Sequence, residues 1–207
     1  MVKMLKNILG AVILTMVLVS GSFAGLNTKH GIRVNDTLPS ASSVKNVTVG
    51  IKNGQNFSNH YHGWKSAMSE AVYLLNIEAY DAGSSVKFQW TGSSSADVLM
   101  EYGYLASDVY ATANYGSSNG IGKKMVINSL KYLSFNTKIK ILKHELLHTI
   151  GFAHSRTDSE SFSVMVANTN SFWEWQYYGH SIMETSISRI PFNLSELDKR
   201  ALRTIFP

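Results

Sequence analysis

The stretch HELLHTIGFAHS at residues 144–155 constrains this chain more than any other. It holds three of the chain's seven histidines and a glutamate within eleven positions. On a helix, His144 and His148 leave the same face one turn apart, so two imidazole nitrogens can reach one metal ion. Glu145 is rotated away from that face, which keeps its carboxylate off the metal but within reach of a water molecule on it.

Gly151 accounts for the arrival of a third ligand. Glycine tolerates the left-handed conformation that ends a helix, so the chain can turn back there and bring His154 toward the metal. Three histidines leave one tetrahedral position for water, as in catalytic zinc sites, whereas structural sites use four protein ligands. A bare HExxH can occur by chance on an amphipathic helix, but Gly151 and His154 at these offsets favour a Zn²⁺ site with Glu145 as general base and acid.

HELLHTIGFAH matches the pattern HExxHxxGxxH and so resembles the signature of the metzincin zinc metalloendopeptidases. Ser155 follows the third histidine, and a serine at this position resembles the matrixin branch of the family. The resemblance implies an α+β zincin fold, with a twisted mixed β-sheet, two long helices and a short C-terminal helix. It also implies a methionine turn below the metal, for which we prefer Met183 and keep Met165 as the alternative; either could simply fill the core.

The sequence around Met183, YYGHSIMET, is also similar to astacins, but Thr185 stands where astacins place a tyrosine zinc ligand. The matrixin cysteine switch requires a cysteine, and the chain has none. Some metzincins hold themselves inactive with an aspartate from an N-terminal segment, a role that the resemblance leaves open for Asp36.

The N-terminus has the pattern of a signal peptide over residues 1–24. Two lysines precede an apolar run at 8–19, and small residues follow it at 22 and 24, the −3 and −1 positions of a cleavage site. The run is too short for a comfortable transmembrane helix, although an uncleaved anchor is the alternative. We therefore expect a secreted or periplasmic protein without a stable membrane span.

Composition narrows the remaining possibilities. With 207 residues, 44% of them hydrophobic, the chain can bury one ordinary core. The absence of cysteine excludes disulfides, thiolate zinc sites and cysteine nucleophiles. Basic side chains are scattered, which argues against nucleic acid as a partner. We expect a monomer that acts on a protein or peptide substrate.

Periodicity divides the exported chain into an extended N-terminal segment at 25–46 and a catalytic domain at 47–207. Alternation and β-branched residues predict strands, and apolar stripes with caps predict helices. The predicted strands are 47–51, 86–90, 97–102, 108–115 and 125–129. The predicted helices are one from residue 64 with an apolar stripe to 75, one at 136–150 capped by Asn136 or Thr137, and one at 194–206 with a capping box of Ser195 and Asp198.

Several weaker features remain open. Tyr177 and Tyr178, in the aromatic stretch 172–178, line a substrate pocket if the resemblance holds. Packing within a loop, or an exposed aromatic surface that binds a protein or glycan partner, would also explain them. Residues 111–115 fall where the family has an edge strand that pairs with an extended peptide.

The histidines outside the motif are ambiguous. His60 and His62 form an HxH pair that could bind a second metal, although no third ligand is near in sequence. His180 could donate to an oxyanion or lie at the surface.

The sequence as a whole indicates a secreted zinc-dependent endopeptidase that hydrolyses peptide bonds by glutamate-assisted attack of zinc-coordinated water. One alternative is a non-catalytic, secreted zinc-binding or adhesion module. Another is a metallohydrolase acting on a non-protein or cell-wall amide.

Overall fold

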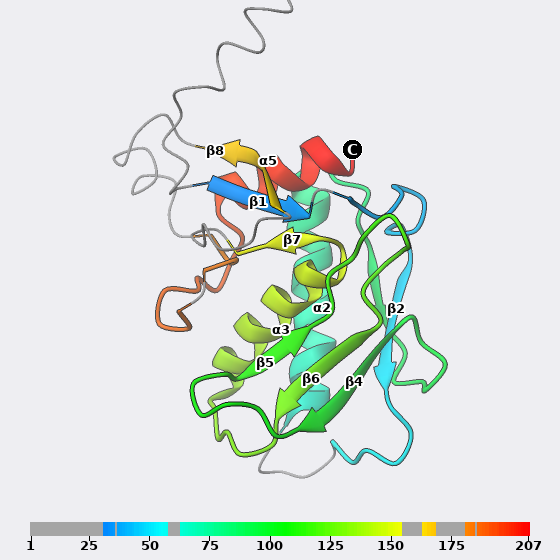
Figure 1. The fold of residues 1–207 in the computed structure, drawn as a ribbon, viewed down its shortest axis with the longest axis vertical. Helices are drawn as coiled ribbons and strands as arrows, with labels where there is room; N and C mark the ends of the chain where they lie inside the picture. The colour runs from blue at the N-terminus through cyan, green and yellow to red at the C-terminus, as the bar shows by residue number, and fades with distance from the viewer. Residues whose placement is uncertain (1–30, 36, 58–62, 155–162, 169–180, 185) are drawn as a thin grey trace, which may run out of the picture.

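The computed structural model describes residues 31–35, 37–57, 63–154, 163–168, 181–184 and 186–207. Two sheets and three helices make up this part of the chain (Figure 1). The strands are β1 (Gly31–Asn35), β2 (Val47–Ile51), β3 (Phe88–Trp90), β4 (Val98–Gly103), β5 (Ala111–Ala113), β6 (Lys124–Asn128), β7 (Phe152–Ala153) and β8 (Ser163–Asn168). The helices are α2 (Trp64–Asp81), α3 (Phe135–Thr149) and α5 (Glu196–Ile205).

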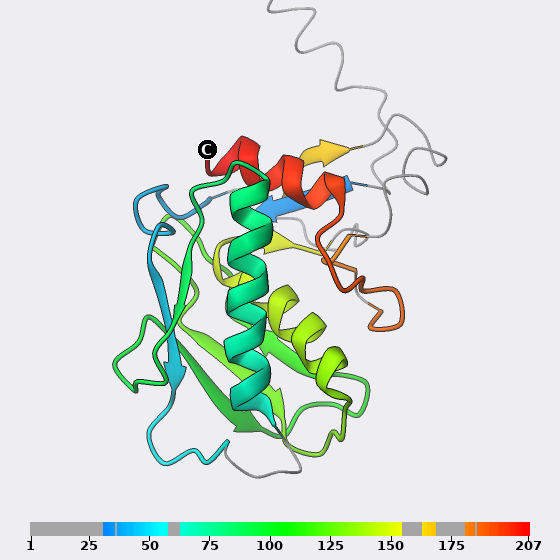
Figure 2. The ribbon, with the colours of Figure 1, turned by 180° about the vertical axis from the view of Figure 1, so that it is seen from behind.

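The larger sheet has five strands in the order β3-β2-β4-β6-β5. The first four are parallel to one another, and β5 pairs antiparallel with β6 at the edge. Helices α2 and α3 cover the same face of this sheet (Figures 1 and 2). The mixed α+β architecture is therefore confirmed, and each of the five predicted strands overlaps an observed one.

A second, three-stranded antiparallel sheet has the order β7-β1-β8 and lies next to α5 (Figure 1). Strand β1 comes from the segment at 25–46, in which the sequence pattern predicts no strand. It pairs Val34 with Phe152 in β7 and with Val164 in β8. Because both partners lie more than a hundred residues further along the chain, local periodicity could not reveal this strand.

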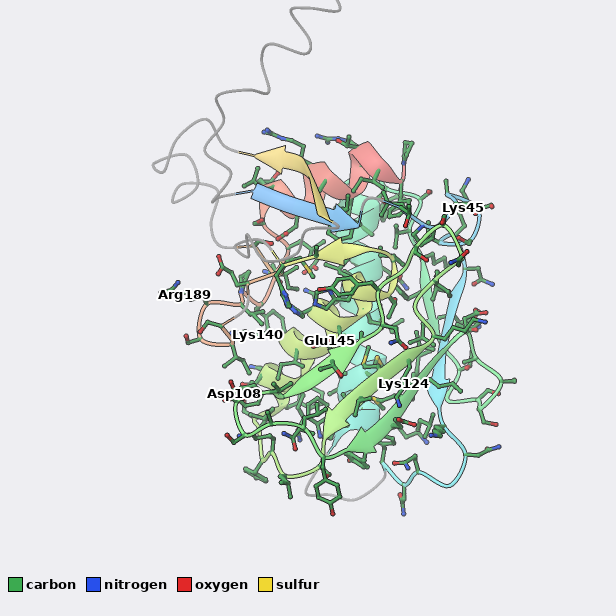
Figure 3. All side chains as sticks on the ribbon, in the orientation of Figure 1. Lys45, Asp108, Lys124, Lys140, Glu145 and Arg189 are labelled. Atoms are coloured by element: carbon green, nitrogen blue, oxygen red, sulfur yellow. The ribbon has the colours of Figure 1, made fainter. Side chains whose placement is uncertain are left out.

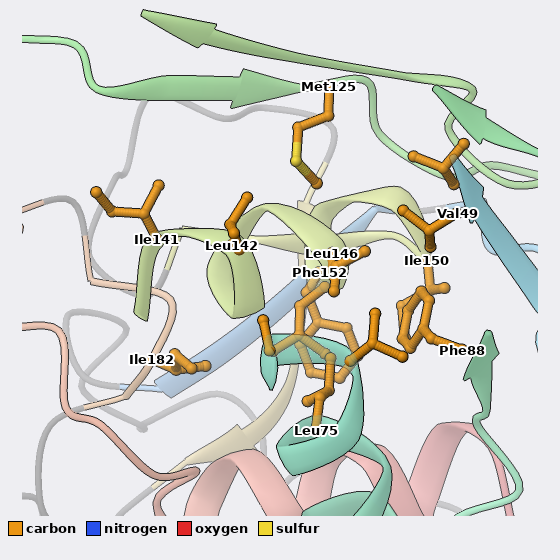
Figure 4. Packing of buried hydrophobic residues seen from close by; sticks show 14 of the residues in the cluster. Val49, Leu75, Phe88, Met125, Ile141, Leu142, Leu146, Ile150, Phe152 and Ile182 are labelled. Carbon is orange, nitrogen blue, oxygen red and sulfur yellow. The ribbon is translucent and has the colours of Figure 1, made fainter. Parts of the chain in front are cut away.

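The core lies between the larger sheet and the two long helices. The apolar stripe predicted on α2, from Trp64 to Leu75, is buried. Helix α3 packs against both the sheet and α2, with Leu142 and Leu146 fully buried and with Met125 on the sheet side and Leu75 on the α2 side (Figure 4). Enclosure on several sides holds the helix that carries His144 and His148 in one orientation.

The helix ends refine two predictions. The capping box at Ser195 and Asp198 is confirmed at the start of α5. The predicted cap of α3 is wrong, because Ser134 is the N-cap and accepts the N–H of Thr137 at 3.2 Å. Ser134 keeps an extended backbone, and its hydroxyl also forms a hydrogen bond of 2.7 Å with the hydroxyl of Thr137.

Among the described helices, none is both long and apolar enough to cross a membrane.

Candidate metal centre

The C-terminal end of α3 brings the three histidines together. His144 and His148 are buried on the helix, and Gly151 then takes a φ of 100° and turns the chain into β7, after which His154 follows. The backbone angle favours glycine here, and a Cβ atom at Gly151 would also lie 2.5 Å from Leu38 Cδ2 and displace that side chain. The predicted reversal at this glycine is thus confirmed.

The ring nitrogens of the three histidines converge. His148 Nε2 lies 2.9 Å from His144 Nε2 and 3.3 Å from His154 Nε2. One coordinating nitrogen from each histidine lies within 4.8 Å of the others. Two nitrogens on one tetrahedral zinc, each about 2.0–2.1 Å from the metal, are about 3.3 Å apart. The spacing therefore fits a single small cation.

Backbone carbonyls fix which nitrogen carries the proton in two of the three rings. His144 Nδ1 donates to Ile182 O at 2.7 Å, and His148 Nδ1 donates to Phe152 O at 2.6 Å. Both Nε2 atoms are then unprotonated, since a neutral imidazole carries one proton. Two lone pairs facing each other at 2.9 Å repel unless a cation lies between them. The three histidines could therefore hold a metal ion.

Burial reinforces the neutral form of these rings. It lowers the pKa of His144 to about 4, with a smaller contribution from nearby His154 and partial opposition from the bond to Ile182 O. It also lowers the pKa of His148 well below its usual value. Neutral imidazole is the form that binds metal, so His144 and His148 have the metal-binding form at neutral pH.

Glu145 is the carboxylate next to the cluster. It is buried, and its Oε2 has no hydrogen-bond partner among the described residues. Burial raises the pKa of Glu145 to about 8. A divalent cation at the histidines would favour the ionised carboxylate and lower this pKa again.

A turn from the C-terminal part supports His144 from the other side. Ile182 and Met183 are its central residues, and the N–H of Glu184 closes it by donating to Ser181 O at 3.2 Å. Met183 is fully buried. Of the two methionine candidates, Met183 thus belongs to the turn that contacts His144, whereas Met165 lies in β8.

Asp198 holds this turn in place, a connection that the sequence analysis missed. Its carboxylate accepts Ser181 Oγ at 2.5 Å and the N–H of Ile182 at 3.0 Å, as well as both donors of Ser195, the N–H at 2.8 Å and Oγ at 2.7 Å. Burial raises the pKa of Asp198, and these donors oppose the rise. The residue that caps α5 therefore also positions the carbonyl that orients His144. The only signal in the sequence was the capping box itself.

A cavity of about 630 Å³ opens beside the cluster. Its lining includes edge strand β5 and three of the four motif residues. The described residues around it are Asp108, Val109, Tyr110, Ala111, Thr112, Ile141, His144, Glu145, His154, Glu184, Ser186, Ile187 and Ile190. The stretch predicted as an edge strand, 111–115, contributes β5, which is at the edge of the sheet as expected.

Other candidates from the sequence lie outside the described residues. They are Asp36, His60, His62, Ser155, Tyr177, Tyr178, His180 and Thr185.

The fold and the site together define a mixed α+β protein with a histidine triad, two of whose rings are buried, that could hold a metal ion. No protein-family model matches the chain, and no curated protein sequence matches it. Among solved structures, myroilysin, a metallopeptidase, is similar with a TM-score of 0.53 at 15% identity, over 84% of this chain and 98% of that one.

A second similar structure is described as the "GM1 bound form of the ECX AB5 holotoxin". The TM-score is 0.56 at 12% identity, over 87% of this chain and 90% of that one. At these identities the likenesses show a shared fold.

Proposed function

We propose that this protein is a zinc-dependent endopeptidase of the metzincin type. The observation that carries the proposal is the convergence of three imidazoles, two of them at the wall of one cavity, next to the buried carboxylate of Glu145. His144, His148 and His154 would hold the metal, and a three-histidine set suits zinc. Zinc would supply Lewis acidity, which polarises a carbonyl and lowers the pKa of water.

Glu145 moves the protons of the reaction. Its Oε2 accepts a proton from the attacking water as the water oxygen bonds to the peptide carbon. The same oxygen then donates that proton to the amide nitrogen as the C–N bond breaks, so the carboxylate returns to its starting state. A carboxyl poised between its ordinary pKa and about 8 can both take and return a proton near neutral pH.

Strand β5 aligns the substrate. It lies at the edge of the sheet, with β6 as its strand partner in the described part of the chain, and it contributes Ala111 and Thr112 to the cavity. An extended peptide adds to such an edge through backbone hydrogen bonds, which recognise the main chain of any sequence. Short side chains on β5 allow that approach.

The similarity to myroilysin supports a peptidase. Because a holotoxin structure has a similar fold as well, the fold alone does not define the activity, and the proposal rests on the site. We assign Met183 as the methionine of the turn below the metal, since this turn supplies the carbonyl that orients His144. Export through residues 1–24 and action outside the cytoplasm remain part of the proposal. They rest on the sequence pattern alone.

The test is cleavage of an unbiased peptide pool read by mass spectrometry, with zinc-loaded protein compared with its Glu145→Ala variant. Zinc content is measured for both, so that loss of activity is not mistaken for loss of metal. Cuts made only by the wild type support the proposal. Zinc-loaded protein that makes no cuts favours the binding module, and release of amines from cell-wall peptidoglycan without peptide cleavage favours the cell-wall hydrolase.

A further inference from the structure

The cavity beside the histidine triad joins aliphatic walls to acidic groups. Ile141, Ile187 and Ile190 contribute the apolar surface, while Asp108 and Glu184 add two carboxylates besides Glu145. None of the described lining residues is lysine or arginine. The buried Oε2 of Glu145, which no described residue hydrogen-bonds, is left to accept a hydrogen bond from a ligand in this cavity.

The two additional carboxylates lie at different depths. Glu184 directly follows Met183 and is only 1% exposed, so its carboxyl group belongs to the inner wall. Asp108 is exposed and lies at the rim (Figure 3). Lys140 on α3 and Arg189 in the segment 186–190 are not among the lining residues. The described lining therefore carries three carboxyl groups and no basic side chain, although the whole chain has a formal charge of +5.

We propose that Glu184 makes the enzyme select substrates with a lysine or arginine side chain next to the cleaved bond, and that Asp108 strengthens this selection from the rim. This inference rests on the proposed endopeptidase function. The methylene stem of a lysine packs against the isoleucine walls while its ammonium group reaches a carboxylate at the end. A charge-assisted hydrogen bond in a partly enclosed pocket discriminates strongly against substrates that lack the cation.

The first test measures binding rather than turnover. Zinc-loaded Glu145→Gln protein, which should bind without cutting, is titrated with labelled peptides that differ at one position beside the cleaved bond: lysine, norleucine or glutamate. Norleucine keeps most of the aliphatic stem but lacks the ammonium group. We expect the lysine peptide to bind tightest, and Glu184→Gln in this background to reduce its advantage over norleucine about tenfold or more.

Two further variants keep the inference open to refutation. Asp81→Asn removes the same charge from the exposed end of α2, outside the cavity, and should leave the lysine preference unchanged. Asp108→Asn should reduce the preference about threefold through the weaker effect of an exposed charge. This rim variant serves as the test if Glu184→Gln fails to fold.

The outcomes separate the two proposals. Equal cleavage and equal binding of lysine and norleucine peptides would overturn the selectivity and leave the endopeptidase function standing. A preference for leucine or phenylalanine over lysine would do the same. Cleavage of no peptide by zinc-loaded wild type would refute the endopeptidase function, while binding to the Glu145→Gln protein would still decide whether the cavity prefers a cation.

Discussion

Replacing Asp198 with alanine should damage the metal centre from a position that touches no ligand. The carboxylate holds Ser181 and Ile182, and the carbonyl of Ile182 accepts the Nδ1 proton of His144 at 2.7 Å. Without Asp198, the turn loses its anchor and the ring of His144 loses a fixed orientation. We therefore expect losses in both stability and zinc affinity.

The magnitude follows from the groups left behind. Two backbone N–H groups, those of Ile182 and Ser195, lose their acceptor inside the protein. A buried donor without a partner costs about 1–3 kcal/mol, so the pair should lower the free energy of unfolding by roughly 4 kcal/mol. Loss of a group that orients a metal ligand typically reduces metal affinity by about 10- to 100-fold.

Urea unfolding of metal-free protein measures the first quantity, and competition with a fluorescent chelator measures the second. Asp198→Asn keeps an acceptor oxygen and should lose less of each. Glu196→Gln, in the same turn of α5 but largely exposed, should change neither. If Asp198→Ala destabilises the protein while zinc affinity stays at the wild-type value, the reasoning that links Asp198 to His144 is refuted.

Three further predictions concern other parts of the core and site. In metal-free protein, the pKa of Glu145 is raised from 4.5 to about 8. Between these pH values the folded state keeps a proton that the unfolded chain has lost, so the free energy of unfolding should fall as the pH rises, by up to about 1.4 kcal/mol per pH unit. Glu145→Gln should remove this component in urea unfolding at several pH values, and an unchanged slope would contradict it. Lys143→Met breaks the buried ion pair with Glu78 at 2.7 Å and should lower the free energy of unfolding by about 3–5 kcal/mol in thermal or urea unfolding. The double variant Lys143→Met with Glu78→Met should recover much of this stability. A double variant as unstable as Lys143→Met alone would refute the pairing. Gly151→Ala should lower stability by about 1–3 kcal/mol from its φ of 100° alone and should also weaken zinc binding, whereas a neutral effect on both would argue against the turn described.

The sequence predicted those features whose signals are local. The periodicity of α2 and α3 and the alternation of the strands each lie within one short stretch. The motif from His144 to His154 also carries its own geometry, because helical spacing and one glycine suffice to bring the nitrogens together.

The parts that the sequence did not predict depend on distant pairing. β1 becomes a strand because β7 and β8 supply its partners. Asp198 was visible only as a helix cap, since nothing local indicates that its carboxylate also reaches Ser181 and Ile182. The N-cap of α3 is Ser134 rather than a predicted residue, because several adjacent residues are suitable caps and the backbone conformation decides among them.

The measurement that tests the central claim most directly is peptide cleavage followed while zinc is added stepwise to metal-free protein. Activity should rise in proportion to zinc and stop rising at one equivalent, and the Glu145→Gln variant should bind the same equivalent without gaining activity. Cleavage that is independent of zinc, or equal in the variant, would contradict the assignment of this triad and glutamate as the catalytic centre.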